Sequence, residues 1–129
     1  MKHYDPLVAP DATEWLSLDE TERLLLVRRY HAEARIELPR IEVHAVIHAI
    51  VENQLAMGIP AVTSACTRLL AQGLDRHETI HAIASVLAGH LNDLCAGFPD
   101  GPQPSANELN ERYYRALSEL TAAKWRALA

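Results

Sequence analysis

Two histidine pairs with the spacing His-x-x-x-His are the residues of this sequence best suited to chemistry. His44 and His48 lie in HAVIHAIVE, and His77 and His81 lie in HETIHAIAS, both otherwise largely apolar stretches. Four residues advance an α-helix by about 400°, so the two imidazoles of a pair stand about 40° apart on one face. Two histidines so placed can present their ring nitrogens to one divalent metal ion.

A carboxylate continues the first pair along the same helix. Glu52 follows His48 by four residues and can serve as a metal ligand or as a general base. If the two helices pack antiparallel, the four imidazoles face each other across the bundle. We therefore predict a site for zinc, iron or manganese made from His44, His48, Glu52, His77 and His81.

The chemistry of such a site depends on its number of ligands. An open coordination position supports metal-activated water or dioxygen chemistry on a small-molecule substrate, of the kind found in metal-dependent hydrolases or oxygenases. Four nitrogen ligands can instead fill a structural zinc shell and leave no position open. The sequence leaves both alternatives open.

A second interpretation needs no metal. Histidines often lie where the apolar face of a helix meets its polar face, with an ordinary hydrogen bond to each ring. The protein is then a non-enzymatic interaction or dimerisation module. Four buried imidazoles would each need a partner, however, and one ion satisfies several of them at once.

Other polar residues near these motifs favour structural roles. His31, directly after Tyr30, is expected to be a partly exposed histidine rather than a further nitrogen of the cluster. Asn53 and Gln54 are expected to form a hydrogen-bond network between helices. For Arg76 an ion pair with a nearby carboxylate is favoured over anion binding.

Capping and breaking residues predict an all-α bundle of about five helices. Capping boxes at Ser17, Asp75 and Ser105 begin three of them, and Pro39, Pro60 and the glycines 58, 73 and 97 mark further boundaries. The expected helices cover about residues 17–34, 40–57, 60–72, 75–96 and 105 onward, with a short helical turn at DATEWL. Residues 1–16 form an N-terminal extended arm packed on the surface.

The C-terminal part is predicted to be separate from the rest. Residues 1–97 form the bundle domain with the histidine-rich site, residues 98–105 a linker, and residues 106–129 an amphipathic helix. An apolar stripe such as Tyr113, Leu117 and Leu120 needs a partner surface. The helix either packs on its own bundle or makes a homodimer with a second copy.

Composition excludes several classes of function. The chain has 129 residues, enough for one core, with 49% hydrophobic and 22% charged residues. A formal charge of -5 with scattered basic residues argues against nucleic acid as a partner, and without a signal peptide or membrane span we expect a cytoplasmic protein. Cys66 and Cys95 are expected to be buried free thiols, and GxSxG and Walker motifs are absent.

Three linked stretches carry a family resemblance. YDPLVAPDATEWLSLDETER, HAVIHAIVENQLAMGIP and GLDRHETIHAIASVL resemble, in this order, a family of small bacterial proteins catalogued as a domain of unknown function. The likeness covers about residues 4–97, and VENQ and RHxxxHAI are its most specific motifs. It implies one folded unit and no assigned reaction. The family typically has a glycine where this chain has Ala84, which leaves the histidine motif unchanged.

Overall fold

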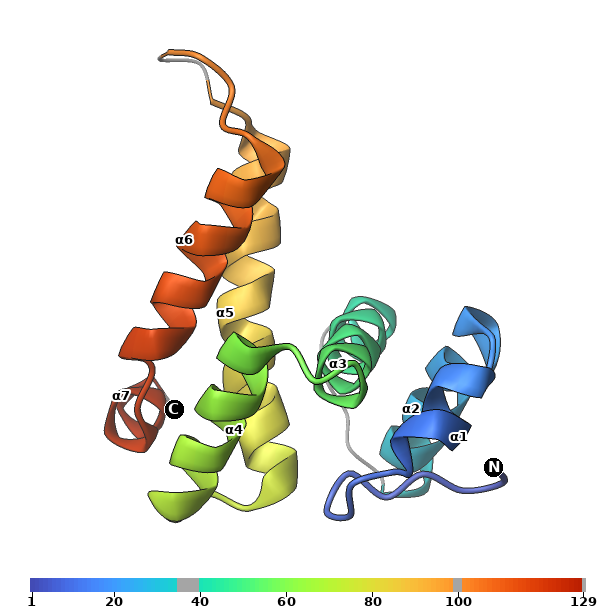
Figure 1. Cartoon of the computed structure of the whole chain (residues 1–129). Helices are drawn as coiled ribbons and strands as arrows, with labels where there is room; N and C mark the ends of the chain where they lie inside the picture. Colours follow the sequence, from blue (N-terminus) through green and yellow to red (C-terminus); the bar gives the residue numbers. More distant parts are fainter. Residues whose placement is uncertain (35–39, 99–100, 129) are drawn as a thin grey trace.

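Seven α-helices and no strand make up the part of the chain that the computed structural model describes, residues 1–34, 40–98 and 101–128 (Figure 1). They are α1 (Ala12–Ser17), α2 (Glu20–Glu33), α3 (Ile41–Ala56), α4 (Pro60–Ala71), α5 (Arg76–Ala96), α6 (Ala106–Glu119) and α7 (Ala122–Ala127). The all-α prediction is confirmed, whereas the count of about five is too low. The turn at DATEWL is a helix of its own, and the last predicted helix is divided in two.

Short polar side chains begin most of these helices. Asp75 and Ser105 accept a hydrogen bond from the backbone N–H three residues later, so these two predicted caps are confirmed. The predicted cap at Ser17 is wrong, because Ser17 is the last residue of α1 and its hydroxyl donates to the carbonyl of Glu14. Asp19 caps α2 instead. The predicted helix end at Pro39 lies outside the described residues.

Two groups of buried apolar residues meet at α3. One is formed with α4, α5, α6 and α7, and includes Val51, Leu69 and Ile83. The other is formed with α1, α2 and the N-terminal segment, and includes Trp15 and Val27. The expected single core is thus two clusters that share one helix. Both sides of α3 must be largely apolar for this reason, which is why its histidines lie among apolar residues.

The direction of α3 is set by the turn that follows it. Gly58 has a φ of 68°, a left-handed conformation that costs a glycine little, and the axes of α3 and α4 differ by 102° across this turn. In Figure 1, α3 is accordingly seen nearly end-on, whereas α4 and α5 lie close to the plane of the picture. In this view α3 crosses α5 rather than running antiparallel to it, so the condition under which the four imidazoles were expected to face each other is not met.

The N-terminal segment before α1 is only in part a surface arm. It contains no helix, as predicted, but Tyr4 is 5% exposed and packs in the same cluster as Trp15. The aromatic rings of Tyr4 and Trp15 have centroids 5.4 Å apart. Burial of these two aromatic side chains fixes the segment against α2 and α3.

The C-terminal helices pack on their own chain. Tyr113, Leu117 and Leu120 are buried against α4 and α5. Arg68 of α4 donates to the carbonyl oxygens of Leu117, at 2.6 Å, and Leu120, at 3.1 Å, which satisfies carbonyls at the end of α6. The sequence predicted that this helix packs either on its own bundle or on a second copy, and the structure shows it packed on its own bundle. A homodimer through this helix stays a prediction, and residues 99–100 of the predicted linker lie outside the described residues.

A helix can span a bilayer only if it is both long and apolar enough. Within the described ranges, no helix taken singly has both the length and the apolar character of a membrane span. In the described ranges, one pair of helices, α3 and α4, is long and apolar enough when the two are taken together, but their axes are bent by 102° at the turn between them.

Candidate metal site

Four imidazoles from three helices converge between the two core clusters. One ring nitrogen of each lies within 4.8 Å of those of the other three. This four-histidine cluster consists of His31 at the end of α2, His44 and His48 on α3, and His81 on α5. The Nε2 atoms of His44 and His81 are 3.1 Å apart. The structure thus brings together three of the four predicted histidines, and adds His31.

The burial of His31 corrects the expectation from sequence. Its side chain is 0% exposed, not partly exposed. His31 follows the apolar residue Val27 by four positions, and residues at i and i+4 lie on the same face of a helix. Val27 is also 0% exposed, so this spacing could have indicated that His31 is buried. A lone histidine gave no repeated motif to draw attention to this face.

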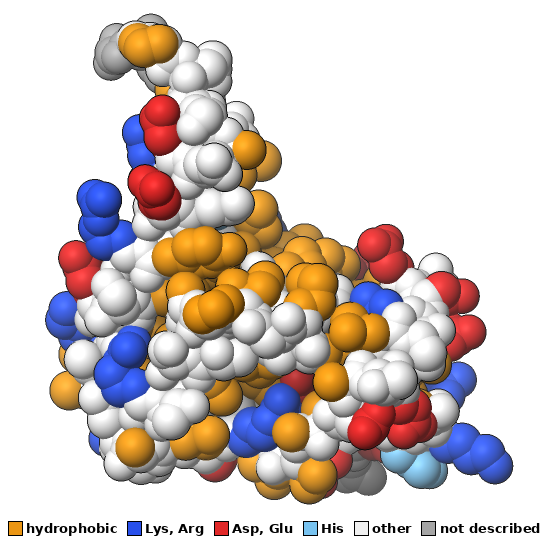
Figure 2. Space-filling model, in the orientation of Figure 1, with side chains coloured by type: hydrophobic (Ala, Val, Ile, Leu, Met, Phe, Trp, Pro, Cys, Tyr) orange, Lys and Arg blue, Asp and Glu red, His pale blue; other side chains and the backbone are white. Residues whose placement is uncertain are grey.

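His77 lies next to the cluster rather than within it. Among the described residues it is not part of the group of four nitrogens. Its ring centroid is 4.1 Å from that of His81 and 5.5 Å from those of His31 and His48. Five imidazoles are therefore gathered in one region, and very little histidine surface shows on the face of the molecule in Figure 2.

Three of these histidines have a buried nitrogen without a hydrogen-bond partner in the described part of the chain. They are Nε2 of His31, Nδ1 of His48 and Nε2 of His77. Buried polar atoms are nearly always paired, and each one left unpaired costs about 1–3 kcal/mol. These three nitrogens lie in one region and could each take a ligand as a partner.

Burial favours the neutral form of His44, His48, His77 and His81. Removal from water, followed by the charge of neighbouring histidines, lowers the pKa of His44 to about 4, of His81 to about 3 and of His48 to about 2. The pKa of His77 is lowered by the same two effects. At pH 7 these rings are neutral and keep a nitrogen lone pair, which is the form that binds a metal ion.

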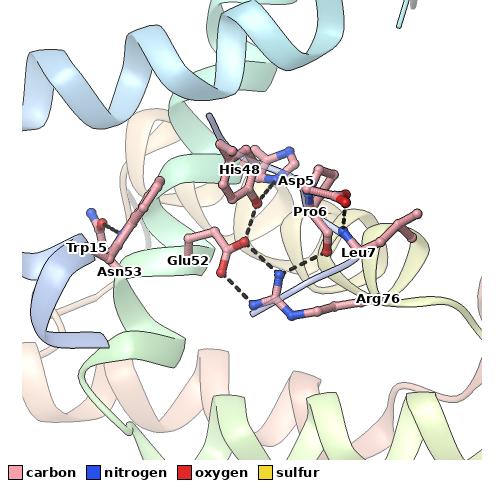
Figure 3. Close-up of polar contacts among 9 residues, drawn as sticks. Asp5, Pro6, Leu7, Trp15, His48, Glu52, Asn53 and Arg76 are labelled. Atoms are coloured by element: carbon pink, nitrogen blue, oxygen red, sulfur yellow. Dashed lines mark hydrogen bonds and ion pairs between the residues drawn. The ribbon is translucent and has the colours of Figure 1, made fainter. Parts of the chain in front are cut away.

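Glu52 lies in a buried ion pair beside the cluster (Figure 3). Its side chain is 1% exposed, and its two oxygens accept hydrogen bonds from Arg76 at 2.7 and 2.8 Å. The hydroxyl of Tyr4 also donates to Glu52, and Nε2 of His48 lies 2.8 Å from that hydroxyl. The predicted ion pair of Arg76 is confirmed. Glu52, predicted as a metal ligand or general base, is thus linked to the cluster through the hydroxyl of Tyr4.

The ion pair should depend on the two-pronged shape of the arginine. Arg76→Lys keeps the positive charge but loses one of two hydrogen bonds to Glu52, so we expect the free energy of unfolding to fall by about 1.5–3 kcal/mol in urea denaturation. Arg28→Lys is the matched control, because Arg28 pairs with the exposed Glu42 at 3.6 Å and should change stability by less than about 0.5 kcal/mol. Equal effects of both substitutions would contradict the structural importance of the buried pair.

The remaining predicted polar residues have structural contacts. Asn53 accepts hydrogen bonds from Trp15 at 2.9 Å and Arg23 at 3.2 Å, and Gln54 accepts one from Tyr113 at 2.7 Å. The predicted network between helices is therefore confirmed.

The two cysteines differ in their surroundings. Both are free thiols, as predicted, but only Cys66 is buried, and its burial raises the pKa of the thiol. Cys95, in the last turns of α5, is exposed. The prediction of two buried thiols is thus correct for one of them.

No family model, no curated protein and no solved structure matches this chain.

Proposed function

We propose that this protein binds a divalent metal ion in the four-histidine cluster. The observation that carries the proposal is the convergence of four imidazole nitrogens, all within 4.8 Å of one another, from α2, α3 and α5. Helices that are packed in a bundle hold such ligands at fixed separations. A metal ion also gives a partner to buried ring nitrogens that have none among the described residues.

The distances suit nitrogen coordination. Bonds of about 2.0–2.1 Å to a tetrahedral zinc ion place ligand nitrogens about 3.3 Å from one another. His44 and His81 are close to this separation at 3.1 Å, and the other separations, which reach at most 4.8 Å, must shorten by up to about 1.5 Å. Because imidazole suits zinc and iron whereas manganese prefers oxygen ligands, the cluster favours zinc or iron over manganese.

Elemental analysis of the purified protein tests the proposal. We expect about one zinc or iron ion per chain in the wild-type protein and a large loss of metal in His44→Ala and His81→Ala. His90→Ala is the matched control, because His90 is also on α5 but its ring stacks on Tyr113, with centroids 5.5 Å apart. A wild-type content below about a tenth of an ion per chain, after refolding with added metal, would favour the interaction module.

A catalytic role for the ion requires an open coordination position. Replacement of the native ion by cobalt(II) measures this, because four-coordinate cobalt has much stronger visible absorption than five- or six-coordinate cobalt. Spectra that change on addition of azide or cyanide support a metal-dependent enzyme with water or a substrate on the ion. Four-coordinate spectra that do not respond support a structural metal site.

A further inference from the structure

The hydrogen bonds around Tyr4 determine where the proton of its hydroxyl lies. Tyr4 donates to an oxygen of Glu52, which also accepts from Arg76 and, as a carboxylate, can only accept. Arg76 and Glu52 form an ion pair, with 2.7 Å between Nη2 and Oε1. Since a carboxylate has no proton to donate, the one proton of the Tyr4 hydroxyl lies in its hydrogen bond to Glu52.

His48 must consequently be the donor in its contact with Tyr4. Since the hydroxyl proton is used by Glu52, the 2.8 Å contact between the Tyr4 oxygen and Nε2 of His48 is a hydrogen bond only if Nε2 carries a proton. A neutral imidazole carries one ring proton. The lone pair of His48 is then on Nδ1, which is the buried nitrogen without a partner in the described residues.

We propose that Tyr4 is a positioning residue of the metal site, which holds His48 as the Nε2–H tautomer and so presents Nδ1 to the ion. This inference rests on the proposed function. His31 provides the converse case. Its Nδ1 lies 2.8 Å from the carbonyl oxygen of Val27, which can only accept, so Nε2 of His31 has the free lone pair. The site then uses different nitrogens of these two histidines.

The N-terminal segment is held in place for this role from two sides. The ring of Tyr4 packs against Trp15 and meets His48 edge-on, with centroids 5.4 and 5.7 Å away. Arg76 donates to the carbonyl oxygen of Pro6 at 2.9 Å as well as to Glu52 (Figure 3). The same arginine thus fixes both the carboxylate that orients the Tyr4 hydroxyl and the backbone that carries Tyr4.

Nuclear magnetic resonance of protein labelled with ¹⁵N in its histidines tests the assignment. In the metal-free wild-type protein we expect the ¹⁵N shifts of His48 to show a protonated Nε2 and an unprotonated Nδ1. After addition of ¹¹³Cd²⁺, we expect coupling of the ion to Nδ1 of His48 and to Nε2 of His31. A merely structural role of Tyr4 does not determine which nitrogen of His48 is coupled.

The substitution Tyr4→Phe removes the hydroxyl and keeps the ring. We expect a mixture of His48 tautomers and a loss of metal affinity of about 10- to 100-fold, as is usual when a partner of a metal-bound histidine is removed. Tyr30→Phe is the matched control, because this neighbouring ring also contacts the histidines, 5.2 Å from His77, but its hydroxyl has no hydrogen bond among the described residues. It should leave tautomer and affinity unchanged.

The outcomes separate the two proposals. Coupling of cadmium to Nε2 of His48 overturns the role of Tyr4 and leaves the metal site intact, as does a Tyr4→Phe protein with unchanged tautomer and affinity. Failure of the wild-type protein to bind cadmium, zinc or iron overturns the metal site and with it this role. If Tyr4→Phe does not fold, the tautomer and coupling of wild-type His48 still decide the assignment.

Discussion

Excess zinc is expected to raise the melting temperature of the metal-free protein by about 15 °C. An ion that binds only the folded state stabilises it by about 4.1 kcal/mol when its concentration is 1,000 times the dissociation constant. For a domain of this size, each kcal/mol shifts the melting temperature by about 3–5 °C. Thermal unfolding followed by circular dichroism, with and without zinc, measures the effect.

The effect should depend on the four-histidine cluster alone. We expect His81→Ala to lose nearly all of the zinc-induced shift, because His81 supplies a ring nitrogen 3.1 Å from that of His44. His90→Ala should keep the full shift, since His90 lies further along α5 and stacks on Tyr113. A full shift in His81→Ala would place the stabilising ion elsewhere on the protein.

The metal-free protein is expected to lose stability steeply between pH 6.5 and pH 4. The pKa values of His44, His48 and His81 are about 4, 2 and 3 in the folded state and about 6.5 in the unfolded state. Below pH 6.5 the unfolded state binds more protons than the folded state does. The free energy of unfolding is therefore highest above pH 6.5 and falls as the pH drops toward the folded-state pKa values. Each histidine contributes up to about 1.4 kcal/mol per pH unit.

Urea denaturation of metal-free protein at several pH values measures this slope. His48→Gln keeps a side chain that can donate to Tyr4 but cannot take up a proton, so it should reduce the slope by about 1.4 kcal/mol per pH unit near pH 5. His3→Gln is the control, because His3 is exposed in the N-terminal segment, and it should leave the slope unchanged. An unaltered slope in His48→Gln would mean that this ring is not held neutral in the folded protein.

Local sequence signals predicted most of the helices but not their packing. The caps at Asp75 and Ser105 and the glycine at 58 are read from neighbouring residues, and the structure confirms them as boundaries. The crossing of α3 over α5 depends on the backbone conformation of the turn at Gly58 and on two core clusters that share α3. The sharing of α3 by two clusters is not a local property, so the spacing of the histidines could not show how α3 and α5 are oriented.

The candidate site was predictable where a motif repeats and not where a contact is long-range. The spacing of His44 and His48 places them on one face from sequence alone, and His81 follows from the second motif. His31 and Tyr4 have no motif, and only folding brings Tyr4 to His48, 44 residues away. For Glu52 the sequence correctly placed the side chain on the face of α3 that carries the histidines. It did not show that the partner of Glu52 is Arg76, which lies on α5.

X-ray absorption at the metal edge of the purified, metal-loaded protein tests the central claim most directly. If the four-histidine cluster holds the ion, the nearest shell contains about four nitrogen atoms at about 2.0–2.1 Å, with the outer-shell scattering typical of imidazole rings. A shell of oxygen atoms without imidazole scattering would show an ion bound at the surface and would contradict the account.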